Sequence, residues 1–104
     1  MKIYILTDLE GVAGVSAFEH CSPGGRFYQR SRQLLTEEVN AAIKGAFLGG
    51  AQEIVVWDGH GPGGINPEEL HTRAQLIAGR GAPQNCGLDS SFDAMFVIGQ
   101  HAMN

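Results

Sequence analysis

Three short apolar runs stand out along the chain, and each predicts a β-strand. They are residues 3–7, 53–57 and 94–98, and they are rich in β-branched, aliphatic and aromatic side chains. The first run is near-continuously apolar, which is typical of a strand that is buried on both faces, as in a parallel sheet. A shorter segment at residues 74–78 predicts an additional edge strand.

The pattern changes between the first two runs, where residues 27–48 have the periodicity of an amphipathic helix. Its apolar positions recur three or four residues apart, at Leu35, Val39, Ala42, Ile43, Ala46 and Phe47. Gly49-Gly50 supplies a signal for the C-terminal end of this helix. A second, short helix is predicted from Pro67 to Leu70, with Asn66 as its N-cap.

Together these elements predict an α/β fold with an open, mostly parallel sheet of three to four strands and flanking helices. The strand, helix and strand at the start form a βαβ unit with a right-handed crossover. A length of 104 residues allows one domain, so residues 1–104 are predicted to form a single α/β domain.

Charge and hydropathy exclude several classes of partner. A net charge of −4 provides no basic surface for nucleic acid or for an anionic membrane. No apolar stretch is long enough to span a bilayer, and the start of the chain lacks the features of a signal peptide. A cytoplasmic chain with Cys21 and Cys86 as free thiols is therefore expected.

Four potential metal ligands each follow the end of a predicted strand. Asp8 and Glu10 follow the first run, His60 follows the second, and His101 follows the third. Because sites in open α/β sheets form beyond the carboxyl ends of the strands, these side chains are expected to converge. Carboxylate and imidazole ligands together suit Zn²⁺, with Mn²⁺, Co²⁺ or Fe²⁺ possible, and two metal ions sharing a carboxylate would fit the set.

Each of these residues also has a simpler interpretation. Asp8 is compatible with a turn or helix cap, Glu10 and His60 with solvated loop residues, and His101 with a histidine satisfied by neighbouring groups. All four residues follow the ends of predicted strands, and this shared position favours a metal site over four unrelated structural roles. Asp58 lies two residues before His60. It is predicted to support the site without binding the metal, by holding the loop or orienting the imidazole.

Two other features have weaker functional interpretations. The segment Gly59–Gly64 matches the G-x-G-x-x-G pattern of dinucleotide sites, but Pro62 removes one backbone N–H and no acidic residue follows at the required distance. Arg26, Arg30 and Arg32 are interpreted as one solvated helix face rather than an anion site.

Several motifs resemble, in order, the N-terminal portion of the D-aminopeptidase family of metallopeptidases. The resemblance covers essentially the whole chain and includes D-x-E-G, D-x-H and G-x-H-A elements. The matching segments are Thr7–Gly14, Arg32 with Thr36–Ala41, Trp57–His60, Leu76–Gly79 and Gly99–Ala102.

This resemblance implies a zinc-dependent aminopeptidase that removes N-terminal residues, including D-residues, from short peptides by means of metal-activated water. It assigns two zinc ions to a site whose ligands here are Asp8, Glu10, His60 and His101. It also implies a ring-like homo-oligomer. Family members are longer, and their further acidic ligand and catalytic histidine are expected beyond residue 104, so the chain is expected to be the incomplete N-terminal part of a larger domain.

Two other function classes remain open at this point. A different two-metal hydrolase, such as a phosphoesterase, would need cationic groups near the site, for which Arg80 and Arg26 are the candidates. A non-catalytic metal-binding or assembly module would bind zinc without turnover.

Overall fold

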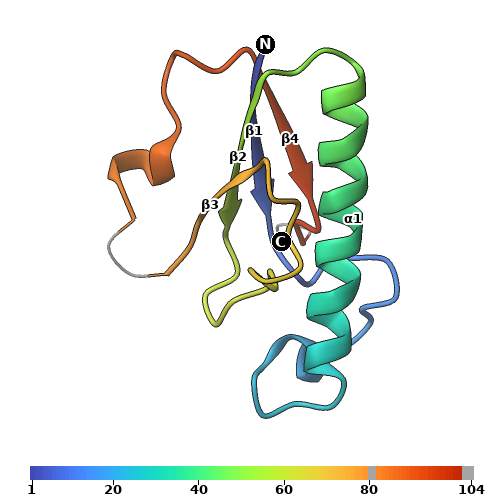
Figure 1. The fold of residues 1–104 in the computed structure, drawn as a ribbon. Coiled ribbons are helices and arrows are strands. Elements are labelled where there is room, and N and C mark those ends of the chain that lie inside the picture. The colour runs from blue at the N-terminus through green and yellow to red at the C-terminus, as the bar shows by residue number, and fades with distance from the viewer. Residues whose placement is uncertain (80–81, 102–104) are drawn as a thin grey trace.

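The computed structural model describes residues 1–79 and 82–101, with the side chain of Phe18 excepted. Four parallel strands form one open sheet in the order β3-β2-β1-β4 (Figure 1). The strands are β1 (Lys2–Thr7), β2 (Glu53–Asp58), β3 (Gln75–Ile77) and β4 (Ala94–Ile98). The predicted α/β fold is confirmed, including the short edge strand.

One α-helix, α1 (Tyr28–Leu48), occurs in the part of the chain that the structure describes, together with two 3₁₀ turns. These turns are η1 (Phe18–Cys21) and η2 (Gln84–Gly87). Helix α1 connects β1 to β2 and lies along the sheet (Figure 1). No helix among the described residues is long and apolar enough to cross a membrane.

The core forms where α1 packs on one face of the sheet. Leu35, Val39 and Ile43 of the helix are fully buried and belong to one cluster with alternate residues of the central strands. These strand residues pair in register, Ile3 with Ile54 and Ile5 with Val56. Because alternate residues of a strand point to the same face, the apolar row of α1 covers both central strands at once.

The opposite face of the sheet is only partly covered. Tyr4 is 2% exposed, because Phe92 packs against its ring at 5.2 Å and its hydroxyl donates a hydrogen bond to the Cys86 carbonyl at 2.8 Å. On β4, however, Met95 and Val97 are each 50% exposed. The expectation of burial on both faces, made for residues 3–7, is therefore confirmed in β1, whereas β4 is an edge strand with a half-exposed face.

The predicted helix from Pro67 to Leu70 is wrong, since these residues form a turn. The Asn66 carbonyl accepts hydrogen bonds from the N–H groups of Glu69 and Leu70, as at the start of a helix. The Asn40 side chain on α1 then bonds to the Glu69 carbonyl and the His71 N–H, both at 2.8 Å. Backbone groups that would extend the turn are thereby engaged by α1 instead.

Candidate metal centre

The ends of three strands lie level with one another, and the loops that follow them are joined by backbone hydrogen bonds. Thr7 pairs with Asp58 on one side and with Ile98 on the other. Beyond the strands, the Asp8 N–H donates to the Ile98 carbonyl and the Gly59 N–H donates to the Thr7 carbonyl, each at 3.0 Å. The sheet therefore brings together the loops that carry the predicted ligands.

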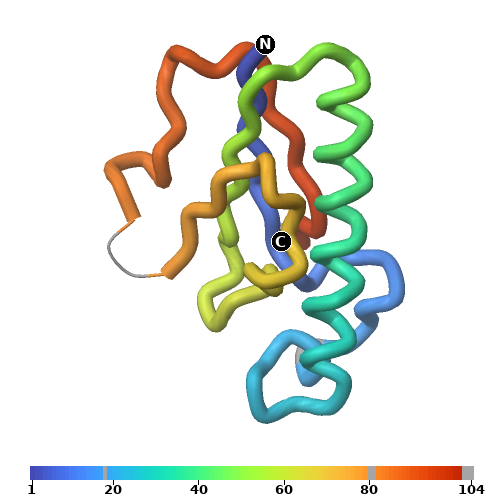
Figure 2. Tube along the Cα trace, viewed as in Figure 1, coloured from blue at the N-terminus to red at the C-terminus, as the bar shows by residue number. Residues whose placement is uncertain are grey.

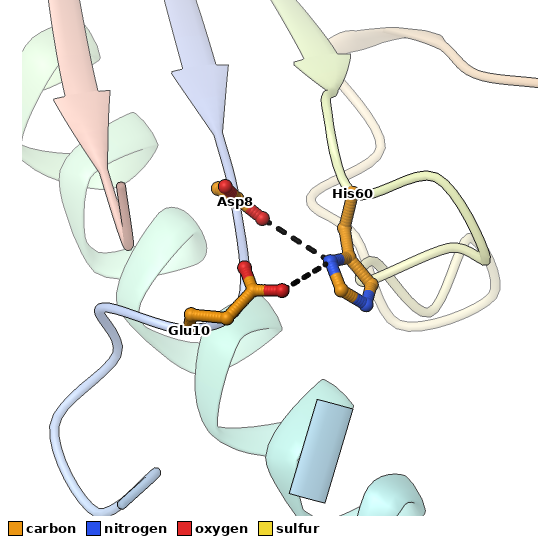
Figure 3. Close-up of side chains that lie close together, drawn as sticks. All are labelled: Asp8, Glu10 and His60. Carbon is orange, nitrogen blue, oxygen red and sulfur yellow. Dashed lines mark hydrogen bonds and ion pairs between the residues drawn. The ribbon is translucent and has the colours of Figure 1, made fainter. Parts of the chain in front are cut away.

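Asp8, Glu10 and His60 form one tight cluster (Figure 3). His60 Nδ1 lies 3.2 Å from Asp8 Oδ1 and 3.3 Å from Glu10 Oε1. One potential ligand atom from each residue lies within 4.8 Å of the other two. Asp8 and His60 are 7% and 8% exposed, so the cluster is largely shielded from water.

The orientation of the His60 ring is set from its far side by a backbone carbonyl. His60 Nε2 lies 2.5 Å from the carbonyl oxygen of Cys21, the last residue of η1. Because a carbonyl only accepts hydrogen bonds, Nε2 carries the proton in the neutral ring and Nδ1 presents its lone pair to the two carboxylates. This is the usual outer contact of a metal-bound histidine, and no sequence pattern indicates it because the group is main-chain.

Asp58 holds the loop that carries His60. Its carboxylate accepts hydrogen bonds from the N–H groups of His60 at 3.3 Å and of Gly64 and Ile65 at 3.0 Å. Of the two roles predicted for Asp58, the structure contains the loop contact, whereas the imidazole itself contacts Cys21. The same bonds occupy N–H groups of the G-x-G-x-x-G segment that a dinucleotide phosphate would need.

The two carboxyl groups of the cluster differ in acidity. Burial raises the pKa of Asp8, but hydrogen bonds from the Glu10 carboxyl and the Leu9 N–H, together with the contact to His60, outweigh it, so the pKa lies below its ordinary value. Burial raises the pKa of Glu10, and the neighbouring Asp8 carboxylate raises it further. Asp8 therefore loses its proton more readily than Glu10 does.

His101 lies at the margin of this cluster. Its Nε2 is 3.4 Å from Asp8 Oδ2, and its side chain is 52% exposed. The residues that meet the distance requirement for a common metal ion are Asp8, Glu10 and His60. His101 therefore stays a predicted ligand, and Ala102 of the predicted G-x-H-A motif lies outside the described residues.

The residues present fit a divalent cation. Glu10 Oε2 is buried and has no hydrogen-bond partner within residues 1–79 and 82–101. A buried carboxylate oxygen without a partner is costly, and a cation beside it would remove that cost. One imidazole nitrogen and two carboxylates are also donors that Zn²⁺ commonly takes.

A small cavity opens beside the cluster. It has a volume of about 230 Å³ and is lined by Glu10, Val15, Ser16, Ala17, Cys21 and His101. A molecule in this cavity would lie against the Glu10 carboxylate and the edge of the predicted metal site.

Zinc binding is expected to weaken as the pH falls, beginning at a higher pH than for an ordinary glutamate ligand. Because the pKa of Glu10 is raised, protons compete with the metal for this carboxylate from a higher pH than they would for an ordinary glutamate. Chelator-competition titrations across a pH series would measure this effect. In Glu10→Gln the affinity should be lower and its pH dependence shallower. A wild-type affinity that does not change with pH would contradict the expectation.

Comparison with known proteins places this geometry in context. A protein-family model described as D-aminopeptidase matches residues 1–104. A D-aminopeptidase from Bacillus subtilis (strain 168) is 37% identical over 105 residues, which cover 98% of this chain and 38% of that protein.

A solved structure is also similar over nearly the whole chain. It is the Zn-dependent D-aminopeptidase DppA from Bacillus subtilis, described as a self-compartmentalizing protease, with a TM-score of 0.92 and 37% identity. The match covers 99% of this chain and 39% of that one. The chain thus spans about two fifths of the length of the relatives it matches.

Proposed function

The chain belongs to the D-aminopeptidase family, and from this membership we propose that it is the metal-binding N-terminal portion of a zinc-dependent aminopeptidase. Its substrates would be short peptides, from which it would remove N-terminal residues, D-residues included. The observation that carries the proposal is the buried cluster of Asp8, Glu10 and His60, with its unpartnered Glu10 oxygen. A relative that is Zn-dependent supports zinc as the metal.

In the proposed site, Asp8, Glu10 and His60 hold a zinc ion, with His101 as a further ligand. Zinc, when bound, would supply Lewis-acid polarisation of the scissile carbonyl and a lowered pKa for water. The Cys21 carbonyl keeps His60 Nδ1 directed at the carboxylates, and Asp58 fixes the loop beneath it. The cavity beside Glu10 provides room for the N-terminal residue of a peptide, whose free amine would pair with this carboxylate.

The remaining features of the proposed enzyme extend beyond the described residues. We propose a second zinc ion, with its acidic ligand and the catalytic histidine contributed from beyond residue 104. A ring-like homo-oligomer is supported by the self-compartmentalizing relative. A cytoplasmic location is supported by the two free thiols, Cys21 and Cys86.

Peptide hydrolysis with added Zn²⁺ tests this function directly. The protein should release D-alanine from D-Ala-D-Ala and leave a phosphodiester intact, and Asp8→Ala should abolish the release. Hydrolysis of the phosphodiester alone would favour a phosphoesterase. That alternative needs cationic groups, but Arg26 stacks over the Phe27 ring at 5.1 Å and Arg80 lies outside the described residues.

A second candidate function follows from the share of the relatives that the chain covers. At 38% of the length of its relative, the 104-residue chain on its own is also compatible with a metal-binding or assembly module. Stoichiometric zinc binding with no peptide release would support that alternative for this chain.

A further inference from the structure

Four polar residues on α1 occur at every fourth position and form a row on the helix surface. They are Tyr28, Arg32, Thr36 and Asn40, called here the polar stripe. Residues four apart lie one above the other on a helix, so the stripe runs beside the apolar row of Leu35, Val39 and Ile43. Tyr28 and Thr36 are 5% and 1% exposed, so the stripe is not a solvated face.

Each residue of the polar stripe bonds to the backbone that follows His60, and the contacts keep the same order along both segments. The Tyr28 hydroxyl donates to the carbonyls of Pro62 and Gly63. Arg32 Nη2 donates to the Ile65 carbonyl at 2.8 Å. The prediction that Arg32 belongs to a solvated helix face is therefore wrong.

The second half of the polar stripe continues the same pattern. Thr36 Oγ1 accepts a hydrogen bond from the Asn66 N–H at 3.0 Å. Asn40 bonds to the Glu69 carbonyl and to the His71 N–H. Segment 62–71, drawn in yellow in Figure 2, is thus bonded to α1 between Tyr28 and Asn40. This part of the helix is about 18 Å long, because each helical residue adds about 1.5 Å.

These contacts meet the Asp58 contacts at one residue, Ile65. The Ile65 N–H donates to Asp58 Oδ2, while its carbonyl accepts from Arg32. Ile65 itself is 1% exposed. The loop that carries His60 is therefore held from the strand side by Asp58 and from the helix side by the polar stripe.

Buried polar groups on a helix are expensive unless they are bonded, and an apolar row would pack against the loop without that requirement. The polar groups add a defined geometry, because each hydrogen bond fixes the position of one backbone atom of the loop relative to α1. From these contacts we propose that Tyr28, Arg32, Thr36 and Asn40 are positioning residues that set the place of His60 in the metal site. This inference rests on the proposed function for its metal and on the hydrogen bonds for its mechanism.

The test uses the double variant Tyr28→Phe with Thr36→Val, which removes two hydroxyl groups and changes side-chain shape little. Its zinc affinity is expected to fall about tenfold, as for other residues that orient a ligand from behind. At saturating Co²⁺ its visible absorption spectrum should also differ from wild type. A loss of stability alone would not alter that spectrum. Restoring one hydroxyl, as Tyr28→Phe with Thr36→Ser, should recover part of both signals.

Amide hydrogen exchange separates this inference from the proposed function. The N–H groups of Gly64 and Ile65 bond to Asp58, which the variants leave intact, so their faster exchange in the double variant reports displacement of the loop. The Ile5 amide in β1 serves as a reference for global unfolding, and Gln29→Ala, at an exposed position of α1, as the matched control. If the wild type binds neither metal, the proposed function fails, and faster exchange at Gly64 and Ile65 still supports the positioning role. Wild-type exchange at these amides in the double variant would overturn it.

Discussion

Replacing His60 by alanine is expected to lower the zinc affinity of this protein by more than about a hundredfold. Mutation of groups that only orient a ligand already costs 10- to 100-fold, and His60 is the one nitrogen donor in the three-residue cluster of the described chain. Without the ring, Asp8 and Glu10 would face each other with no imidazole between them. Competition titration with a zinc chelator of known affinity would measure the loss.

His71→Ala is the matched control for this experiment. His71 lies in the same connection between β2 and β3, where its ring packs against Phe47 at 5.8 Å, away from the cluster. Its loss should leave zinc affinity unchanged. Zinc binding by His60→Ala at the wild-type level would show that the metal binds elsewhere and that the ligand assignment is wrong.

Replacing Gly99 by alanine is expected to destabilise the fold by about 3 kcal/mol or more, and to disturb the metal site as well. Gly99 has a φ of +75°, and a Cβ there would lie 2.0 Å from the Asp8 carbonyl oxygen and 2.9 Å from Val12 Cγ2. The closer of these contacts is with backbone, which cannot rotate away. The loop after β4 would therefore have to move off the loop that carries Asp8.

Urea unfolding followed by circular dichroism would measure this destabilisation, and a zinc titration of the same variant would report on the site. Gly45→Ala provides the contrast, because this exposed position lies inside α1 and a Cβ there meets nothing within 4 Å. It should stabilise the protein by about 0.5–1 kcal/mol. Equal stability of Gly99→Ala and wild type would mean that the two loops are not packed as described.

The convergence of Asp8, Glu10 and His60 was predictable because it depends on two local facts. Apolar runs define where the strands end, and parallel strands place those ends at one edge. The partial exposure of β4 was not predictable in the same way. Its sequence is as apolar as that of β1, but exposure is decided by which elements cover it, and Met95 and Val97 have half of their surface uncovered.

The hydrogen bonds that orient His60 and hold its loop could not be predicted from the sequence either, for a different reason. The Cys21 carbonyl that contacts His60 is a group that every residue possesses, so no residue type indicates it. Arg32 and Asn40 have the spacing of the polar flank of any amphipathic helix, and only the path of the following loop shows that they are bonded. Likewise, the turn after Asn66 has the residues of a helix start but lacks the free backbone groups to continue.

The outer edge of β4 has a consequence for how this sheet can be extended. Within the described residues β4 pairs with β1 alone, so its other side presents backbone N–H and carbonyl groups beside two half-exposed apolar side chains. Such an edge is a template for another strand. A further strand can pair with β4 there without displacing β1 or the metal cluster. Where this edge of the sheet is uncovered, it favours edge-to-edge association of copies of the chain.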